Sequence, residues 1–427
     1  MAESRRVLVF PCGTEIGLEL HRSLAYSRHF SIWGASSVDD HGRMVYRNYI
    51  GGLPFVDEPQ FLSALKACIQ KHRIDYVFPA HDSVIVRLAG RDAELGAEVV
   101  TSAAETCRIC RSKRLTYAFF RNLLPVPEVY ESPAEAPYPL FLKPEIGQGS
   151  RGALRVDSRL QAEAALERDP GLMVMEFVPG EEYTIDCFTD RHRQLLFAGA
   201  RRRQRISSGI SVRSAVVADA SLHQMAAVIN EKLSLRGAWF FQVRRRQNGE
   251  PVLLEIAPRI AGTMGLYRAL GVNFALLSLF DRMNLDVRLQ PLNISAGVER
   301  ALVSRFDLQL NYQVVYVDLD DCLLDSEGVN VELIRFLYQA RNNGKRLVLL
   351  TRHRRDVLQS LQAAAISERL FDQIVVVPEQ HHKSDYIKER EAIFIDDSFS
   401  ERQRVQAACG IATFSPDAVE ALLDWRR

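Results

Sequence analysis

The sequence predicts three domains of α/β, α+β and α/β class, covering residues 1–108, 109–308 and 309–427. In the first and last domains, short apolar strand patterns alternate with amphipathic helix patterns, as is typical of parallel sheets covered by helices. Between them, from about Thr106, paired short strand patterns separated by glycine-containing turns replace this alternation. The length of 427 residues fits two to four domains at roughly 100–200 residues each.

The composition excludes several classes of protein. Hydrophobic residues make up 47% of the chain and charged residues 25%, which is the balance of a globular protein and excludes fibrous and disordered chains. The net charge is only +1, so we expect neither a nucleic-acid partner nor a membrane partner. The seven cysteines are scattered, and the sequence has no apolar run of signal-peptide or membrane-span length. We therefore expect a cytoplasmic protein.

The first domain predicts a small, mostly parallel sheet. The expected strands are Arg6–Phe10, Ser31–Ala35, Tyr76–Pro79 and Glu98–Thr101, and the expected helices are Glu15–Ser27 and Phe61–His72. No GxGxxG motif follows the first strand, so a dinucleotide site is not expected. Glu15 and the pair His81-Asp82 follow strands, where open α/β sheets bind ligands. We expect these three residues to contact substrate, with helix capping as the alternative.

In the middle domain, a lysine near the end of a predicted strand is followed by a glycine-rich loop. The loop residues of interest are Lys143, Gly147, Gly149, Ser150 and Gly152. A lysine in this place can reach a phosphate group as a point charge. Glycines let backbone N–H groups approach phosphoryl oxygens without a Cβ in the way. For this loop alone, a hairpin with a solvated lysine is the alternative.

Motifs further along supply groups that suit a purine, a ribose and a metal ion. An apolar strand ends at Glu176, and the backbone of Glu176, Phe177 and Val178 can meet an adenine edge. After a Pro-Gly turn, a glutamate can accept hydrogen bonds from ribose hydroxyl groups. Gln242 and Glu255 lie on two later strands, and oxygen ligands on neighbouring strands suit Mg²⁺ bridging two phosphates.

This combination resembles the ATP-grasp superfamily, particularly the carbamoyl-phosphate synthetase large subunit and the amino-acid ligases. The resemblance covers about residues 5–300 and implies a Rossmann-like pre-ATP-grasp domain followed by an ATP-grasp fold. It implies ATP and Mg²⁺ as cofactors, with Mn²⁺ as an alternative metal. The segment Phe10–Gly17 is similar to ATP-grasp proteins found with bacterial tellurite-resistance-type operons.

The resemblance also implies roles for individual residues. The residues that would contact ATP are Lys113, Lys143, the hinge Glu176, Phe177 and Val178, and the ribose-binding Glu182. Those that would act on the phosphates are the metal-holding Gln242 and Glu255 and the catalytic Arg259. Arg203 and Arg205 would hold an anion, with a solvated strand face as the alternative. The family often has asparagine where this chain has Ala257, which removes one metal oxygen.

The last domain begins with a buried strand that delivers two carboxylates. Asp318 and Asp320 lie two residues apart, so they point to the same side at the end of the strand. One can attack a phosphoryl group while the other moves a proton to the leaving oxygen. A second strand ends at Thr351, and a third feature is Lys383. The pair Asp396-Asp397, which can hold Mg²⁺, then ends a further strand.

These four signals resemble the haloacid-dehalogenase (HAD) superfamily in its phosphatase form. The resemblance implies that Asp318 is the nucleophile and Asp320 the acid/base, and that Thr351 and Lys383 hold the phosphoryl oxygens. It implies a metal site of Asp318, Asp320 and Asp396, supported by Asp397. The family usually has threonine where this chain has Cys322, a weaker hydrogen-bond donor. The short spacings between the motifs leave no room for an inserted cap domain.

The two resemblances together predict a bifunctional enzyme. An ATP-grasp ligase would join a small-molecule carboxylate to an amine through an acyl phosphate. A capless Rossmann-like HAD domain would hydrolyse a phosphorylated substrate. One alternative is an ATP-grasp kinase opposed by its own phosphatase domain, and another is a nucleotide-sensing regulator. A homo-oligomer is compatible with either enzyme.

Overall fold

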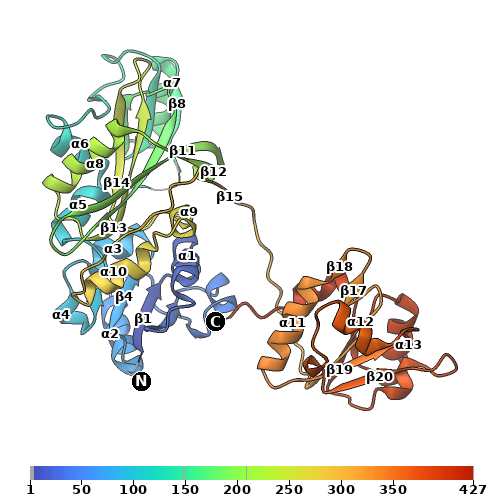
Figure 1. The fold of residues 1–427 in the computed structure, drawn as a ribbon. Helices are drawn as coiled ribbons and strands as arrows, with labels where there is room; N and C mark the ends of the chain where they lie inside the picture. Colours follow the sequence, from blue (N-terminus) through green and yellow to red (C-terminus); the bar gives the residue numbers. More distant parts are fainter. Residues whose placement is uncertain (1–3, 148, 150, 208, 427) are drawn as a thin grey trace. The chain divides into compact units, whose positions relative to one another are not determined.

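The computed structural model describes residues 4–147, 149, 151–207 and 209–426. It divides into two compact units, which Figure 1 colours blue to yellow and orange to red. Unit 1 extends to Leu302, and unit 2 runs from Val303 to Trp425. Within the described residues, no helix is both long enough and apolar enough to cross a membrane. Because unit 1 is one compact body, the first two expected domains pack together.

Unit 1 begins with a five-stranded parallel sheet of order β3-β2-β1-β4-β5. Its strands are β1 (Arg5–Phe10), β2 (Phe30–Ala35), β3 (Asn48–Ile50), β4 (Tyr76–Pro79) and β5 (Glu98–Val99). The accompanying helices are α1 (Glu15–Leu24), α2 (Phe61–His72), α3 (Asp82–Leu88) and α4 (Asp92–Leu95). The loops after β1 and β4 lie at the same edge of the sheet, since neighbouring parallel strands end there. The sequence pattern missed β3, which has no buried side chain.

The rest of unit 1 contains two antiparallel sheets. The smaller has the order β6-β9-β7-β8 and the larger the order β14-β13-β10-β11-β12-β15. The smaller sheet consists of β6 (Val129–Tyr130), β7 (Leu140–Pro144), β8 (Leu154–Val156) and β9 (Leu172–Glu176). The larger consists of β10 (Glu182–Thr189), β11 (Leu195–Ser207), β12 (Ile210–Val217), β13 (Gly237–Arg245), β14 (Pro251–Ala257) and β15 (Gly297–Glu299). Figure 1 shows this pair of sheets in green and yellow.

Six helices accompany these sheets. They are α5 (Ala104–Arg111), α6 (Lys113–Phe120), α7 (Arg159–Arg168), α8 (Ala220–Lys232), α9 (Gly265–Ala269) and α10 (Phe274–Arg282). The buried faces of α5, α6 and α8 pack on the large sheet around Trp239 and Phe241. This core makes the large sheet a rigid support for the polar side chains on its strands.

Unit 2 is a five-stranded parallel sheet of order β20-β19-β16-β21-β22. Its strands are β16 (Val314–Val317), β19 (Arg346–Thr351), β20 (Gln373–Val376), β21 (Ala392–Ile395) and β22 (Ala412–Phe414). Its helices are α11 (Val331–Asn342), α12 (Val357–Ala363) and α13 (Phe399–Cys409). Only the small hairpin β17–β18 (Leu324–Asp325 and Gly328–Val329) lies between β16 and α11. The carboxyl ends of β16, β19 and β21 therefore meet at one open edge.

We predict that a core mutation in unit 2 destabilises that unit alone. Leu349 on β19 is fully buried, and Leu349→Ala should cost about 2–5 kcal/mol of unfolding free energy. Leu358→Ala on α12, whose side chain is 50% exposed, is the matched control with an expected change within about 0.5 kcal/mol. Hydrogen exchange read by mass spectrometry would follow both units. Equal loss of protection in unit 1 would contradict two independent units.

Candidate active sites

A cavity of about 760 Å³ lies in unit 1 and collects most of the residues that the sequence singles out. The predicted residues that line it are Lys113, Lys143, Gly147, Gly149, Glu176, Phe177, Val178, Glu182, Gln242, Glu255 and Arg259. Gly152 has a φ of 71° and lies between two lining residues, Arg151 and Ala153. Ser150 lies outside the described residues. The groups predicted to bind ATP thus share one cavity.

Two lysines bring positive charge to this cavity, and both amines bind neutral oxygens. The Lys143 amine donates to the Tyr117 hydroxyl over 2.8 Å, and the Lys113 amine donates to the Glu145 carbonyl over 3.2 Å. Burial lowers the pKa of Lys143 to about 8, and the neighbouring Lys113 acts in the same direction. The charge of Glu255 opposes this shift. Two cations held this close favour a ligand with several negative charges.

Glu182 belongs to a polar network that spans the large sheet. Its carboxylate pairs with Arg203 and lies 3.3 Å from Nε of Arg244. Arg203 also donates to the side-chain oxygen of Gln242 over 3.3 Å. Arg205 instead pairs with Glu299 at 2.6 Å with its side chain 60% exposed. Of the two arginines expected to hold an anion, Arg203 lies in the cavity, whereas Arg205 fits the solvated alternative.

The hinge after β9 is held by an arginine that the sequence reasoning missed. Arg246 donates from Nε and Nη2 to the two oxygens of Glu176, over 2.7 and 2.8 Å. These hydrogen bonds keep the pKa of Glu176 below its usual value. The side chain of Glu176 therefore fixes the hinge. The backbone around Phe177 and Val178 lies at the cavity wall, where it can meet a flat ligand.

In the same cavity lining, residues that follow the strands β1 and β4 meet residues that follow β14. Arg259 binds both oxygens of Asp82 over 2.5 and 3.0 Å. Burial alone would raise the pKa of Asp82, but the guanidinium of Arg259 outweighs it and holds the pKa low. Glu15 also lines the cavity and pairs with Arg300 at 2.6 Å. His81 lines it too, and its ring caps α3 by accepting from the Ser83 N–H.

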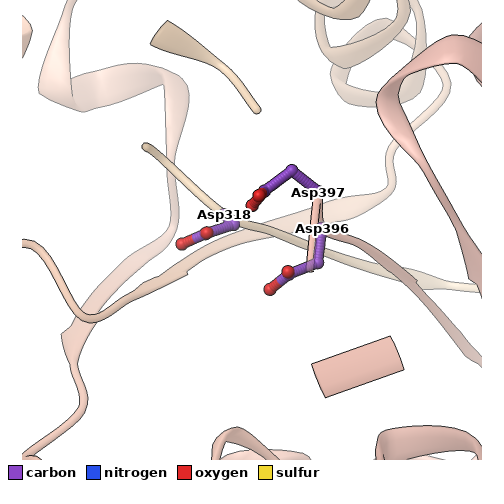
Figure 2. Close-up of side chains that lie close together, drawn as sticks. All are labelled: Asp318, Asp396 and Asp397. Atoms are coloured by element: carbon purple, nitrogen blue, oxygen red, sulfur yellow. The ribbon is translucent and has the colours of Figure 1, made fainter. Parts of the chain in front are cut away.

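In unit 2, three carboxylates meet at the open edge of the parallel sheet. Figure 2 shows Asp318 beside Asp396 and Asp397, and one oxygen of each lies within 4.8 Å of the others. The amine of Lys383 lies 2.9 Å from Asp318 and 2.6 Å from Asp396. Burial raises the pKa of Asp396 to about 6. Three carboxylates at this spacing suit Mg²⁺ or Mn²⁺.

Thr351 and Asp320 take different positions around these carboxylates. Thr351 is fully buried at the end of β19. Burial raises the pKa of Asp318, and Lys383 and the nearby Thr351 hydroxyl act in the opposite direction. The carboxylate of Asp320 lies outside the group of three and contacts Nδ1 of His353 at 2.7 and 3.0 Å. The group of three therefore contains Asp397 and not Asp320, which the resemblance implied as a metal ligand. The thiol of Cys322 is buried, 3.8 Å from the Ile395 carbonyl oxygen.

Comparison with known proteins identifies the fold of unit 1. A family model described as "ATP-grasp in the biosynthetic pathway with Ter operon" matches residues 168–302. This match agrees with the ATP-grasp resemblance, whereas the segment Phe10–Gly17 lies outside the matched residues. No curated protein sequence matches the chain significantly.

Solved structures with low sequence identity share the fold. The biotin carboxylase–β,γ-ATP complex from Campylobacter jejuni matches with a TM-score of 0.59 and 14% identity, over 69% of this chain and 75% of its own. The L-amino acid ligase from Bacillus licheniformis matches with a TM-score of 0.57 and 17% identity, over 69% and 79%. The biotin carboxylase domain of Hydrogenobacter thermophilus 2-oxoglutarate carboxylase, solved with MgADP, has a TM-score of 0.57 and 12% identity, over 69% and 73%. The chain therefore contains an ATP-grasp fold.

We predict that Lys143 costs unit 1 stability at neutral pH. Its pKa of about 8 in the folded protein lies below the ~10.4 of an unfolded lysine. Burying the protonated Lys143 amine therefore costs folding free energy below about pH 8. This cost decreases as the pH rises toward ~10.4, because the unfolded lysine then also loses its proton. Lys143→Met should stabilise unit 1 by about 1–3 kcal/mol at pH 7 and by less at pH 9.5.

Denaturant unfolding at the two pH values measures this difference. The matched control is Lys66→Met on α2, where the lysine is exposed and the expected change is within about 0.5 kcal/mol. A Lys143→Met variant that is less stable than the parent at pH 7 would show that burial of the charged Lys143 amine does not cost folding free energy.

Proposed function

We propose that unit 1 is an ATP-dependent ligase that joins a carboxylate to an amine. The observation that carries this proposal is the shared cavity in which Lys113 and Lys143 face Glu255 and the hinge after β9. Two cations and two flexible glycine positions, Gly147 and Gly149, suit a triphosphate. The ATP-grasp fold supports the same assignment.

Each group in the cavity has a task in this reaction. The hinge backbone binds adenine, Glu182 accepts from the ribose, and the two lysines neutralise the phosphate oxygens. Gln242 and Glu255 would hold Mg²⁺, which draws charge from the β- and γ-phosphates when bound. The carboxylate oxygen attacks the γ-phosphorus, ADP leaves, and an acyl phosphate forms.

The second half of the reaction takes place at the end where Arg259 and Arg300 lie. An amine attacks the acyl carbon, the C–O bond to phosphate breaks, and an amide and inorganic phosphate form. Arg259, which lines the cavity at this end, would stabilise the charge of the phosphoryl group. Glu15 and Asp82 lie beside these arginines and are the groups that would bind the amine substrate.

We also propose that unit 2 is a phosphatase of the capless HAD type. The observation that carries it is the buried Lys383 between Asp318 and Asp396, with the buried Thr351 at the end of the neighbouring strand β19. Asp318 attacks the phosphorus, and Asp320 gives a proton to the leaving oxygen. Asp320 then takes a proton from the water that cleaves the aspartyl phosphate. Asp318, Asp396 and Asp397 would hold Mg²⁺, which neutralises the transferred phosphoryl group.

The ligase proposal predicts ATP turnover that requires two co-substrates. In a metabolite screen, ADP release should need a carboxylate and an amine together. Lys143→Ala should weaken ATP binding by about 10–100-fold, and Glu255→Gln should lower turnover by about 10²–10³-fold. ADP release with a single hydroxyl acceptor and a stable phosphoester would favour a kinase. ATP that binds but is never consumed would favour a nucleotide sensor, for which the missing metal oxygen at Ala257 is a reason.

The phosphatase proposal predicts that the two activities separate. Asp318→Asn should lower phosphoester hydrolysis by more than about 10³-fold, because the amide keeps the size of the side chain but is not a nucleophile. ATP binding measured by calorimetry should not change. Lys143→Ala should show the reverse pattern. Loss of both activities in either variant, with intact folding by circular dichroism, would contradict two separate active sites.

A further inference from the structure

The loop that follows β19 contacts Asp320, the second carboxylate after β16. The loop begins at the buried Thr351, whose hydroxyl accepts from the backbone N–H of His353 over 3.2 Å. Two residues on, the His353 ring binds Asp320 through Nδ1 at 2.7 and 3.0 Å. The side chain of His353 is 11% exposed, whereas that of Asp320 is 51% exposed. Asp320 therefore rests against a nearly buried partner at the edge of an open site.

The other ring nitrogen of His353 is also occupied. Nε2 lies 2.7 Å from the hydroxyl of Ser360 on α12. Ser360 lies one helical turn after Asp356, which caps the start of α12. With both nitrogens bonded, the imidazole cannot turn freely, and its position is fixed by a helix rather than by the exposed loop. The contact with Ser360 thus fixes the His353 ring on α12, and the ring in turn holds the carboxylate of Asp320.

The hydrogen bond between Nδ1 of His353 and the carboxylate of Asp320 can run in either direction. If the carboxylate is ionised, it can only accept, so Nδ1 donates; if it is protonated, its O–H donates to Nδ1. In the proposed phosphatase reaction, Asp320 must give a proton to the leaving oxygen and take one back from water. A partner that bonds to both forms keeps the carboxylate in place throughout this cycle.

We propose that His353 is the positioning residue for the general acid Asp320, with Ser360 fixing the imidazole. The proposal rests on the phosphatase function proposed for unit 2. In the first step the Asp318–phosphorus bond forms, the bond from phosphorus to the leaving oxygen breaks, and the Asp320 proton moves to that oxygen. In the second step water gives its proton to Asp320, its oxygen bonds to phosphorus, and Asp318 is released. His353 returns unchanged.

The experiment compares two esters that differ in their need for a proton. The leaving oxygen of phenyl phosphate needs a proton, whereas the phenolate of 2,4-dinitrophenyl phosphate leaves without one. With the full-length chain and Mg²⁺, His353→Leu should lower kcat for phenyl phosphate by about 10²-fold or more. For the dinitrophenyl ester the loss should stay below about threefold, because general-acid catalysis contributes little there.

Two further variants separate positioning from folding. His353→Asn keeps an N–H donor near the place of Nδ1 and should recover most of the lost activity on phenyl phosphate. Ser360→Ala should give the same ester-dependent loss in weaker form. His223→Leu removes an exposed histidine on α8 and should change neither rate.

The outcomes distinguish this inference from the function on which it rests. If the parent chain hydrolyses neither ester, the phosphatase proposal fails and the role of His353 fails with it. If the parent is active and Asp318→Asn is inactive, the phosphatase stands. In that case, equal losses on both esters in His353→Leu, or no recovery in His353→Asn, would overturn the positioning role alone.

Discussion

A lysine kept out of water is the constraint on which each of the two sites depends. Burying an ammonium group is costly unless nearby groups compensate its charge. In unit 2, Lys383 is compensated directly, because it lies within 2.9 Å of Asp318 and 2.6 Å of Asp396. In unit 1, Lys143 bonds to a neutral hydroxyl and has Lys113 as a neighbour, and its pKa falls to about 8. The lysine of unit 2 is thus compensated without a ligand. The lysine of unit 1 is compensated only in part, by the charges of Glu255 and Glu182, until an anion binds.

Arginine–carboxylate pairs hold the walls of the unit 1 cavity, and Arg259 is the arginine that is also proposed to act on the phosphoryl group. Arg246 fixes the hinge through Glu176, and Arg259 links the end of the large sheet to Asp82 at α3. A forked guanidinium can bind both oxygens of a carboxylate and keeps its charge at every accessible pH. Ion pairs therefore hold the cavity walls, whereas the amines of Lys113 and Lys143 remain available to phosphate oxygens.

The sequence was most informative where a chemical group lies near the end of a strand or directly after it. Lys143, Glu255, Asp318 and Asp396 could be identified because strand ends and spacing decide where such side chains lie, and the structure places them at a cavity wall or sheet edge. Parallel strands in unit 2 end at one edge, so motifs far apart in the chain meet without any loop having to be predicted.

The partners of these groups could not be predicted in the same way. His353 contacts Asp320, and Arg259 contacts Asp82, through the packing of segments that are remote in sequence. Hydrophobic periodicity describes which face of an element is buried, but it does not say which polar side chain lies opposite. For the same reason, the prediction that Asp320 is a metal ligand did not include the polar side chain that lies opposite it. Its carboxylate faces the loop after β19, and Asp397 completes the group of three.

Trapping with hydroxylamine tests the central claim about unit 1 most directly. Hydroxylamine attacks acyl phosphates and converts them to hydroxamates, so it replaces an unidentified amine. The full-length chain would be incubated with ATP, Mg²⁺ and pools of carboxylic acids, and ADP and hydroxamate would be quantified together. The account predicts one hydroxamate for each ADP with an accepted acid, and much less of both products with Lys143→Ala at the same ATP concentration. ADP formed without hydroxamate, alongside a stable phosphoester, would contradict an acyl phosphate and with it the ligase.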